Sequence, residues 1–374
     1  MTRVLLVAPT ANAGGSERWV VSMTGGLPAE GFEPVTVLLD RGPLEDWLTQ
    51  SGCEHRLVPA GRFRYARQTA RTIARLRTLV RETGAEVVLS SSSKGHIYGG
   101  SAVLGLPVRE VWMQHVVPSR TNAQERLAAL VPSAAVVCHS VTVSEAQRRL
   151  RPRAPVVTIP GGVPVAAIAT RAGSGAEIRR RLGWEDAPLV GIVARLQPWK
   201  GQEVFLRAAA LLHAQRPDVR YAVVGGAILG REGSYPDDLE RLAADLGLAQ
   251  AVHFAGHQDD VYPWYDALDV AVHASFGEPF GLAVVEALAL GKPLVASAEG
   301  GPLEIVEDGR SGLLFPAGDP AALATAVQRV LDEPRLAESL ARGARERAAA
   351  FDERTMVSRI AELLRLVVAG GRPE

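Results

Sequence analysis

The sequence has 374 residues, 47% of them hydrophobic, which is enough for two domains of ordinary size with their own cores. The formal net charge is zero, so composition gives no reason to expect a nucleic-acid partner. The two cysteines, Cys53 and Cys138, are too few for a disulfide scaffold, and no Cys/His cluster indicates structural zinc. No run of about 18 apolar residues exists to span a bilayer, and the apolar run 4–8 is too short for a signal-peptide core. We therefore expect a cytoplasmic protein.

Short apolar runs alternate with longer segments of helical character along the whole chain, as in the strand–helix units of parallel sheets. Such short runs are typical of strands that are buried on both faces. In the first half they are 4–8, 35–39, 87–89, 111–113, 135–138 and 156–159; in the second half they are 189–194, 221–224, 252–255, 270–274, 293–296 and 312–315. Two such series predict an α/β protein with two doubly wound domains rather than one large sheet.

A Gly-, Pro- and Ala-rich stretch, 160–175, marks the predicted boundary between a domain over 1–165 and a domain over 166–350. Ligands of open α/β sheets bind beyond the carboxyl ends of the strands. We therefore expect the loops after residues 8, 90, 114, 194, 225 and 275 to line a cleft between the two domains.

The strongest local signal is the segment 275–281 (SFGEPFG), which follows a predicted strand and is expected to open a helix at about Pro279–Phe280. Proline suits the first turn of a helix, because its missing N–H would be unpaired there anyway. The free amides at such a helix start form a site for an anion or a sugar oxygen. The amides expected to do so belong to Phe280, Gly281 and Leu282.

Two glutamates frame this segment, Glu278 and Glu286. Eight helical positions span about 12 Å, too far for the acid–base carboxylate pair of a glycosidase. The spacing suits two hydroxyl-bearing rings at opposite ends of a diphosphate. Taken alone, the pair is more simply explained by a loop glutamate and a glutamate on a solvated helix face.

Two cations, Arg195 and Lys200, follow the predicted strand 189–194. Positive charge at the mouth of a parallel sheet can neutralise a diphosphate and stabilise the charge that develops when a glycosyl bond breaks. The alternative is an exposed basic loop without a ligand.

These two elements and several glycine motifs follow one another along the second half of the chain. The motifs are Arg195-x-x-x-x-Lys200-Gly201, Gly225-Gly226, Phe254-Ala255-Gly256, Ser275-x-x-Glu278-Pro-Phe-Gly, Glu286-Ala287, Gly291-x-Pro293 and Gly300-Gly301-x-x-Glu304. From about Val156 to Gly318 the pattern closely resembles the family-4 retaining glycosyltransferases. The resemblance implies a GT-B fold, in which two Rossmann-like domains face a central cleft.

The resemblance also implies roles for individual residues. Glu278 would meet the donor sugar near its C3 hydroxyl, and Glu286 would hold the ribose hydroxyls of the nucleotide. Arg195 and Lys200 would hold the diphosphate, and the loop Phe254–His257 would lie near the base. It implies a nucleoside-diphosphate sugar as donor, a hydroxyl acceptor, no cofactor and no metal, since two side-chain cations replace a metal.

In the first half, Gly14 and Gly15 stand between the first strand and a helix, where close backbone approach and the helix N-terminus favour phosphate. The spacing is neither Gly-x-Gly-x-x-Gly nor a Walker loop, which weakens dehydrogenase and P-loop interpretations. The family resemblance assigns the Gly15 amide to the donor phosphate. It also places His115, after the strand 111–113, beside the reaction centre; a structural histidine is the alternative.

The acceptor is expected near the polar run 90–96 (SSSSKGH), through Ser93, Lys94 and His96. These side chains suit a polyol or an anionic acceptor, and a polar turn without a ligand is the alternative.

The segment 62–81 carries seven arginines and no acid. Three of them, Arg67, Arg71 and Arg75, share one helical face, with Ile73, Leu76 and Val80 largely opposite. A basic amphipathic helix can dock on an anionic membrane at the inner membrane face, or bind a phosphorylated acceptor; the alternative is a solvated helix face. The seven arginines are Arg62, Arg64, Arg67, Arg71, Arg75, Arg77 and Arg81.

The C-terminal segment is rich in Ala, Arg, Glu and Leu and is predicted to be helical, and in the GT-B architecture the last helix, here 351–374, packs back on the first domain. Two kinds of rival function remain on the same fold. One is a nucleotide-sugar epimerase or glycosyl phosphorylase, and the other is a non-catalytic subunit that binds a sugar nucleotide. The complete set of two cations and two glutamates argues against a degenerate site.

Overall fold

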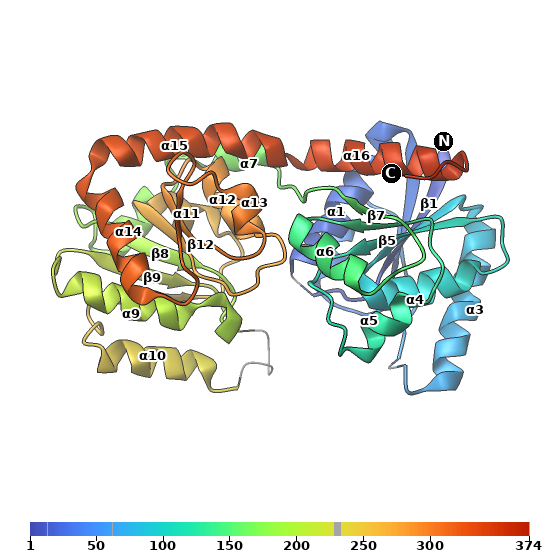
Figure 1. Cartoon of the computed structure of the whole chain (residues 1–374), viewed down its shortest axis with the longest axis horizontal. Coiled ribbons are helices and arrows are strands. Elements are labelled where there is room, and N and C mark those ends of the chain that lie inside the picture. The colour runs from blue at the N-terminus through green and yellow to red at the C-terminus, as the bar shows by residue number, and fades with distance from the viewer. Residues whose placement is uncertain (13, 62, 228–232, 374) are drawn as a thin grey trace. The chain divides into compact units, whose positions relative to one another are not determined.

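The computed structural model describes residues 1–12, 14–61, 63–227 and 233–373, so Arg62 lies outside the described residues. The chain forms two compact units (Figure 1). Unit 1 comprises Met1–Gly162 and Glu353–Glu374, and unit 2 comprises Val163–Asp352. The boundary at 162/163 lies inside the stretch 160–175 that the composition singled out, and the last helix belongs to unit 1.

Unit 1 is built on a parallel sheet that has seven strands in the described part of the chain. Its strands are β1 (Thr2–Ala8), β2 (Phe32–Leu38), β3 (His55–Leu57), β4 (Val87–Ser91), β5 (Arg109–Gln114), β6 (Ala135–Cys138) and β7 (Val156–Thr158). The order across the sheet is β3-β2-β1-β4-β5-β6-β7. β1 therefore pairs with β4, and the chain winds away from this pair in both directions.

Helices cover both faces of this sheet. They are α1 (Gly15–Gly26), η1 (Leu27–Glu30), α2 (Pro43–Gln50), α3 (Ala66–Thr83), α4 (Ser92–Val103), α5 (Ala123–Ala128), α6 (Val141–Arg149) and α16 (Glu353–Val368). Alternate residues of β1 show why. Val4 and Leu6 pack with α1 and α16, whereas Leu5 and Val7 pack with α3 and α4.

Unit 2 has a parallel sheet of six strands within the described residues, in the order β10-β9-β8-β11-β12-β13. The strands are β8 (Leu189–Val193), β9 (Arg220–Val224), β10 (Val252–Gly256), β11 (Val270–His273), β12 (Leu294–Ser297) and β13 (Leu313–Phe315). The helices are α7 (Val165–Ala169), α8 (Ala176–Leu182), η2 (Pro198–Lys200), α9 (Gln202–His213), α10 (Tyr235–Asp245), α11 (Tyr262–Ala267), α12 (Leu282–Ala289), α13 (Pro302–Ile305), α14 (Pro320–Asp332), α15 (Pro334–Ala348) and η3 (Ala349–Phe351).

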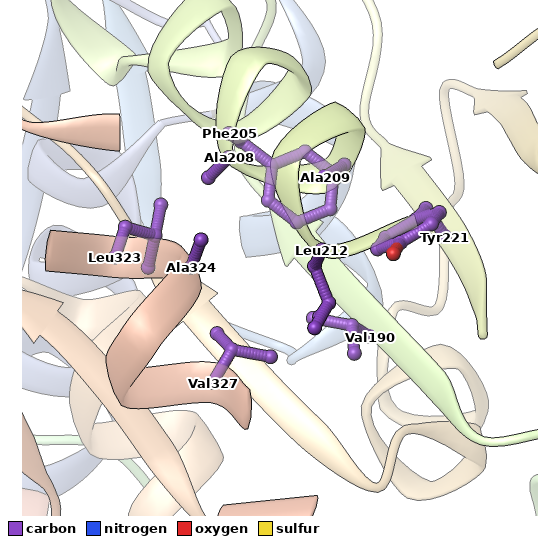
Figure 2. Close-up of a pocket in the computed structure, with 9 residues that line it drawn as sticks. All are labelled: Val190, Phe205, Ala208, Ala209, Leu212, Tyr221, Leu323, Ala324 and Val327. Carbon is purple, nitrogen blue, oxygen red and sulfur yellow. The ribbon is translucent and has the colours of Figure 1, made fainter. Parts of the chain in front are cut away.

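The sheet of unit 2 is also buried on both faces, with α9, α10 and α14 on one side and α8, α11 and α12 on the other. A cavity of about 10 Å³ remains between α9, α14 and strands β8 and β9 (Figure 2). Its walls are apolar side chains such as Phe205, Leu212 and Val327, together with Tyr221. A single water needs roughly 10–15 Å³ and polar partners, so this cavity is a packing gap and not a ligand site.

Three local expectations differ from the structure. The short strand β3 was not predicted, because its sequence, His-Arg-Leu, is only partly buried. The polar run 90–96 is not a turn, since β4 continues to Ser91 and α4 begins at Ser92.

The expected helix start at Pro279–Phe280 is also wrong, because α12 begins at Leu282. The carbonyl of Glu278 accepts a hydrogen bond from the Gly301 amide at 2.8 Å, and Gly281 has a φ of 110°. The backbone before Leu282 is therefore bonded to a neighbouring loop instead of to a helical turn.

Candidate functional site

The crevice of a doubly wound sheet lies where neighbouring strands send their loops in opposite directions, beyond their carboxyl ends. In unit 2 this point falls between β8 and β11. Arg195 and Lys200 follow β8, and Ser275 and Glu278 follow β11. Residues about eighty positions apart in sequence are thus brought together by the strand order.

The two loops are tied together through their backbones. The Phe276 amide donates a hydrogen bond to the Trp199 carbonyl at 2.7 Å. Gly201, with a φ of 74°, ends η2 and begins α9, and a Cβ on it would lie 2.0 Å from the Ala274 carbonyl oxygen. Only glycine allows this approach, which fixes the backbone next to Lys200.

Lys200 and Glu278 form a nearly buried ion pair, with Nζ 2.6 Å from Oε2 and side-chain exposures of 12% and 10%. The ammonium group also lies over the Trp199 ring, 4.0 Å from its centroid. Burial lowers the pKa of Lys200, while the charge of Glu278 opposes this shift. The lysine is therefore held in place by a carboxylate and an aromatic face before any ligand binds.

His273 and Ser275 complete this group. His273 is the last residue of β11, and its Nε2 lies 3.2 Å from Glu278 Oε2 and 3.2 Å from Ser275 Oγ. Ser297 Oγ donates to the carbonyl of Ser275 at 2.7 Å. His273 was not among the site residues predicted from the sequence. The feature that could have indicated it is its position: a polar side chain within a buried apolar strand needs a hydrogen-bonding partner.

Burial by itself would raise the pKa of the Glu278 carboxyl. The hydrogen bond from His273 and the charge of Lys200 outweigh burial, and the pKa of Glu278 lies well below its usual range. Glu278 is therefore an ionised carboxylate that accepts hydrogen bonds, as from a hydroxyl group of a ligand.

The other expected residues of unit 2 lie in the loops after β8 and β10 and in the segment 280–286. Arg195 is exposed, and within the described residues it has no ion-pair partner. Glu286 is buried in α12, with Tyr262 Oη 3.5 Å from its Oε1. Phe280 packs its ring on Phe351 in the core, with centroids 5.9 Å apart. Leu282 opens α12, with Gly281 as its N-cap, and His257 is exposed beside Gly226.

In unit 1 the corresponding switch point falls between β1 and β4. Gly14 is the N-cap of α1, and Gly15 is its first residue. Glu17, which was not among the site residues predicted from the sequence, is buried there. Its carboxylate accepts hydrogen bonds from the hydroxyls of Thr10 and Ser16 at 2.6 and 2.8 Å. The start of α1 thus already carries a negative charge, stabilised by the helix dipole.

His115 follows β5 and is buried. Its Nε2 lies 3.0 Å from Ser91 Oγ, and the Trp19 ring packs edge-on against it with centroids 5.0 Å apart. Burial, with a smaller contribution from His139, holds the pKa of His115 well below its usual value. The imidazole is therefore neutral near pH 7 and offers hydrogen bonds rather than charge.

The expected acceptor contacts need correction. His96 is fully buried, with Nδ1 2.8 Å from Glu110 Oε1, Nε2 3.1 Å from the Ala128 carbonyl oxygen, and its ring stacked on Trp112. Ser93 is also buried and donates to Glu125 at 2.6 Å. Both belong to the interior because α4 packs closely on the sheet. Lys94 alone of the three is partly exposed.

On α3, Arg67, Arg71 and Arg75 are exposed on one face, and Arg75 pairs with Glu82 at 3.1 Å. Leu76 and Val80 are buried on the opposite face, as the pattern predicted. Within the described residues no helix combines the length and apolarity that crossing a bilayer requires. The same residues contain no group of three or more His, Cys, Asp and Glu side chains that could bind a metal ion.

Comparison with known proteins gives concordant matches in both units. Residues 13–167 match the model described as Glycosyltransferase Family 4, and residues 175–347 match that of Glycosyl transferases group 1. A D-inositol 3-phosphate glycosyltransferase of Thermomonospora curvata is 41% identical over 197 residues, covering 51% of this chain and 46% of that protein. D-inositol 3-phosphate glycosyltransferase 2 of Catenulispora acidiphila is 43% identical over 171 residues, covering 44% and 40%. The match thus spans less than half the length of these relatives.

Solved structures match over nearly the whole chain. Anabaena Alr3699/HepE in complex with UDP and glucose superposes with a TM-score of 0.88 at 26% identity, covering 98% of this chain and 100% of that one. The same protein in complex with UDP-glucose gives a TM-score of 0.87 at 25% identity, again over 98% and 100%. With two Rossmann-like units and family matches across both, the chain has the GT-B fold and belongs to glycosyltransferase family 4.

Proposed function

We propose that the chain transfers a sugar from a nucleoside-diphosphate sugar to a hydroxyl acceptor, with retention of anomeric configuration and without a metal ion. The observation that carries the proposal is the meeting of Arg195, Lys200 and Glu278 at the switch point of unit 2. The Anabaena neighbour, solved with UDP and with UDP-glucose, supports a nucleotide-sugar donor.

In the proposed reaction the bond from the anomeric carbon to the diphosphate oxygen breaks. The bond to the acceptor oxygen forms on the same face, and a diphosphate oxygen takes the acceptor's proton. Arg195 and Lys200 stabilise the charge on the departing diphosphate, and this positive charge takes the place of a metal. Lys200 therefore exchanges part of its contact with Glu278 for the ligand.

Glu278 would accept a hydrogen bond from a hydroxyl of the donor sugar, because it is ionised. Glu286 would bind the ribose hydroxyls, and the amides at 280–282 would contact the sugar or the phosphate. In unit 1 the Gly15 amide would bind donor phosphate, and neutral His115 would serve as a hydrogen-bonding partner of the donor sugar.

For the acceptor we propose a compound that carries an anionic group. Lys94 is partly exposed, and within the described residues it has no ion-pair partner. Arg67 and Arg71 on α3 add positive charge in the same unit. The relatives named for D-inositol 3-phosphate fit a phosphorylated acceptor. An anionic membrane surface is the other ligand of the same chemistry, and flotation of the protein with anionic liposomes at low salt distinguishes the two.

The test is binding and turnover with nucleoside diphosphates and their sugars, beginning with UDP and UDP-glucose. Removing one charge-stabilising group typically costs roughly 3–4 kcal/mol in the barrier, so Arg195→Ala and Lys200→Ala should each lower transfer by about a hundredfold or more. Arg329→Ala, on the exposed side of α14, is the matched control. Near wild-type turnover in either site variant, or loss of turnover in EDTA, would reject the proposal.

A further inference from the structure

Both hydrogen-bond donors of Glu278 meet the same carboxylate oxygen. Lys200 Nζ lies 2.6 Å from Oε2, and His273 Nε2 lies 3.2 Å from it. Within the described part of the chain, no donor bonds the other oxygen, Oε1. The carboxylate is thus anchored on one side and available to a ligand on the other.

The surroundings of His273 decide which ring nitrogen donates to Glu278. An ionised carboxylate can only accept, so His273 must carry a proton on Nε2 to bond Glu278. Its Nδ1 is buried and has no hydrogen-bond partner among the described residues. The geometry therefore requires that His273 donates to Glu278 through Nε2, with Ser275 Oγ 3.2 Å from the same nitrogen.

The two donors differ in how firmly they are held. Lys200 has a long side chain, and Arg195 is close enough that its charge acts on the ammonium group. Both cations are the groups that a diphosphate would draw towards itself. His273 belongs to β11 and is 4% exposed, so it stays in place when Lys200 moves.

We propose that His273 is a positioning residue that holds the Glu278 carboxylate ionised through Oε2, and so presents Oε1 to a hydroxyl of the donor sugar. The proposal rests on the sugar-binding role proposed above for Glu278. His273 itself touches no substrate.

Replacing His273 by Gln or by Asn tests whether the donor must stand at the position of Nε2 or at that of Nδ1. The Gln amide nitrogen lies as many bonds from Cβ as Nε2 of histidine, whereas the Asn amide nitrogen lies as many bonds as Nδ1. His273→Gln should therefore keep the donor to Glu278, and His273→Asn should lose it. The two variants are otherwise matched in polarity, so a merely structural role would affect both alike.

The first measurement needs no ligand. The Glu278 side-chain carboxyl is titrated by 13C NMR in the full-length protein, with its signal assigned by Glu278→Gln. Lys200, whose charge acts on this carboxyl, is unchanged in both variants. Losing a donor disfavours the ionised form, so the pKa of Glu278 should rise in His273→Asn, with about a tenfold or larger gain in proton affinity. In His273→Gln it should stay near the wild-type value.

The second measurement is calorimetric binding of UDP and of UDP-glucose. His273→Asn should weaken UDP-glucose binding about tenfold while changing UDP binding little, and the weakening should grow as the pH falls. His273→Gln should bind both ligands within about threefold of wild type. Equal behaviour of the Asn and Gln variants in the titration would overturn the proposal. If the wild-type protein binds neither UDP nor UDP-glucose, the proposed donor is wrong. The NMR titration then still tests the role of His273.

Discussion

At the scale of single residues, the site is dominated by an ion pair that the ligand must partly replace. Lys200 and Glu278 are nearly buried, and each compensates the charge of the other. Before a ligand binds, the Glu278 carboxylate therefore already neutralises part of the positive charge that we propose for the diphosphate. This arrangement keeps both groups ionised and fixed before a donor arrives.

The pair gives a prediction about stability. Lys200→Met leaves a buried carboxylate, and Glu278→Gln leaves a buried ammonium group, so each should destabilise the protein by about 3 kcal/mol. The double variant removes both charges and should lose clearly less than the sum, with a coupling of roughly 1–3 kcal/mol. Urea unfolding of the four proteins measures this cycle. Strictly additive losses would show that the pair is not coupled.

The pH dependence of the free energy of unfolding gives an internal control for this Lys200/Glu278 mutant cycle. The pKa of Glu278 is lower in the folded protein than its ordinary value of 4.5. Its contribution to stability is therefore present above pH 4.5 and is lost as the pH falls below that value. The stability difference between wild type and Glu278→Gln should narrow on acidification through this range.

Some site residues could be predicted from sequence and others could not, for physical reasons. Arg195, Lys200 and Glu278 stand in the loops that follow apolar runs, and the carboxyl ends of parallel strands meet at one edge of a sheet. His96 was misplaced because its polar neighbours suggested a loop. The better signal was Gly95 and Gly99, four positions apart on a helix that packs closely on the sheet; a Cβ on Gly99 would lie 2.4 Å from Ser90 Oγ.

At the scale of elements, buried strands were predicted well because a strand covered on both faces must be apolar throughout. β3 was not predicted, because it is partly exposed. The start of α12 was predicted too early, because the backbone of Glu278 is hydrogen-bonded to that of Gly301 and the helix begins only at Leu282. Contacts with loops distant in sequence decided both cases, and periodicity carries no information about such contacts.

The loop between β8 and α9 gives the prediction at this scale. Gly201→Ala places a Cβ 2.0 Å from the Ala274 carbonyl oxygen at a φ of 74°. Gly247 has a φ of 75° and nothing within 4 Å of a built Cβ, so Gly247→Ala is a matched control for backbone strain alone. The control should cost about 1 kcal/mol, and Gly201→Ala should cost more and weaken nucleotide binding. Thermal unfolding and UDP titration measure both effects; equal results in the two variants would contradict the role given to the close approach.

At the scale of the whole molecule, the double series of apolar runs predicted two doubly wound domains because each sheet needs its own set of strands. Composition could not show that unit 1 is discontinuous in sequence. α16 is an amphipathic helix whose apolar residues, such as Ile360 and Leu364, pack with Trp19 and Met23. The sequence of α16 alone does not identify these packing partners, because its apolar face could pack on any other apolar surface.

The difference in connectivity predicts different behaviour of the two units when they are made separately. Unit 2 is one continuous segment whose ends meet, because the Val163 amide donates to the Phe351 carbonyl at 3.0 Å. The fragment 163–352 should therefore unfold cooperatively on its own and bind UDP. The fragment 1–162 lacks α16 and would expose the apolar face that α16 covers, so it should be insoluble or lack a cooperative transition. Joining 353–374 to 1–162 through a flexible linker should restore that transition. Circular dichroism melts of the three fragments decide the matter, and a cooperative, soluble 1–162 fragment would show that α16 is dispensable for the fold of unit 1.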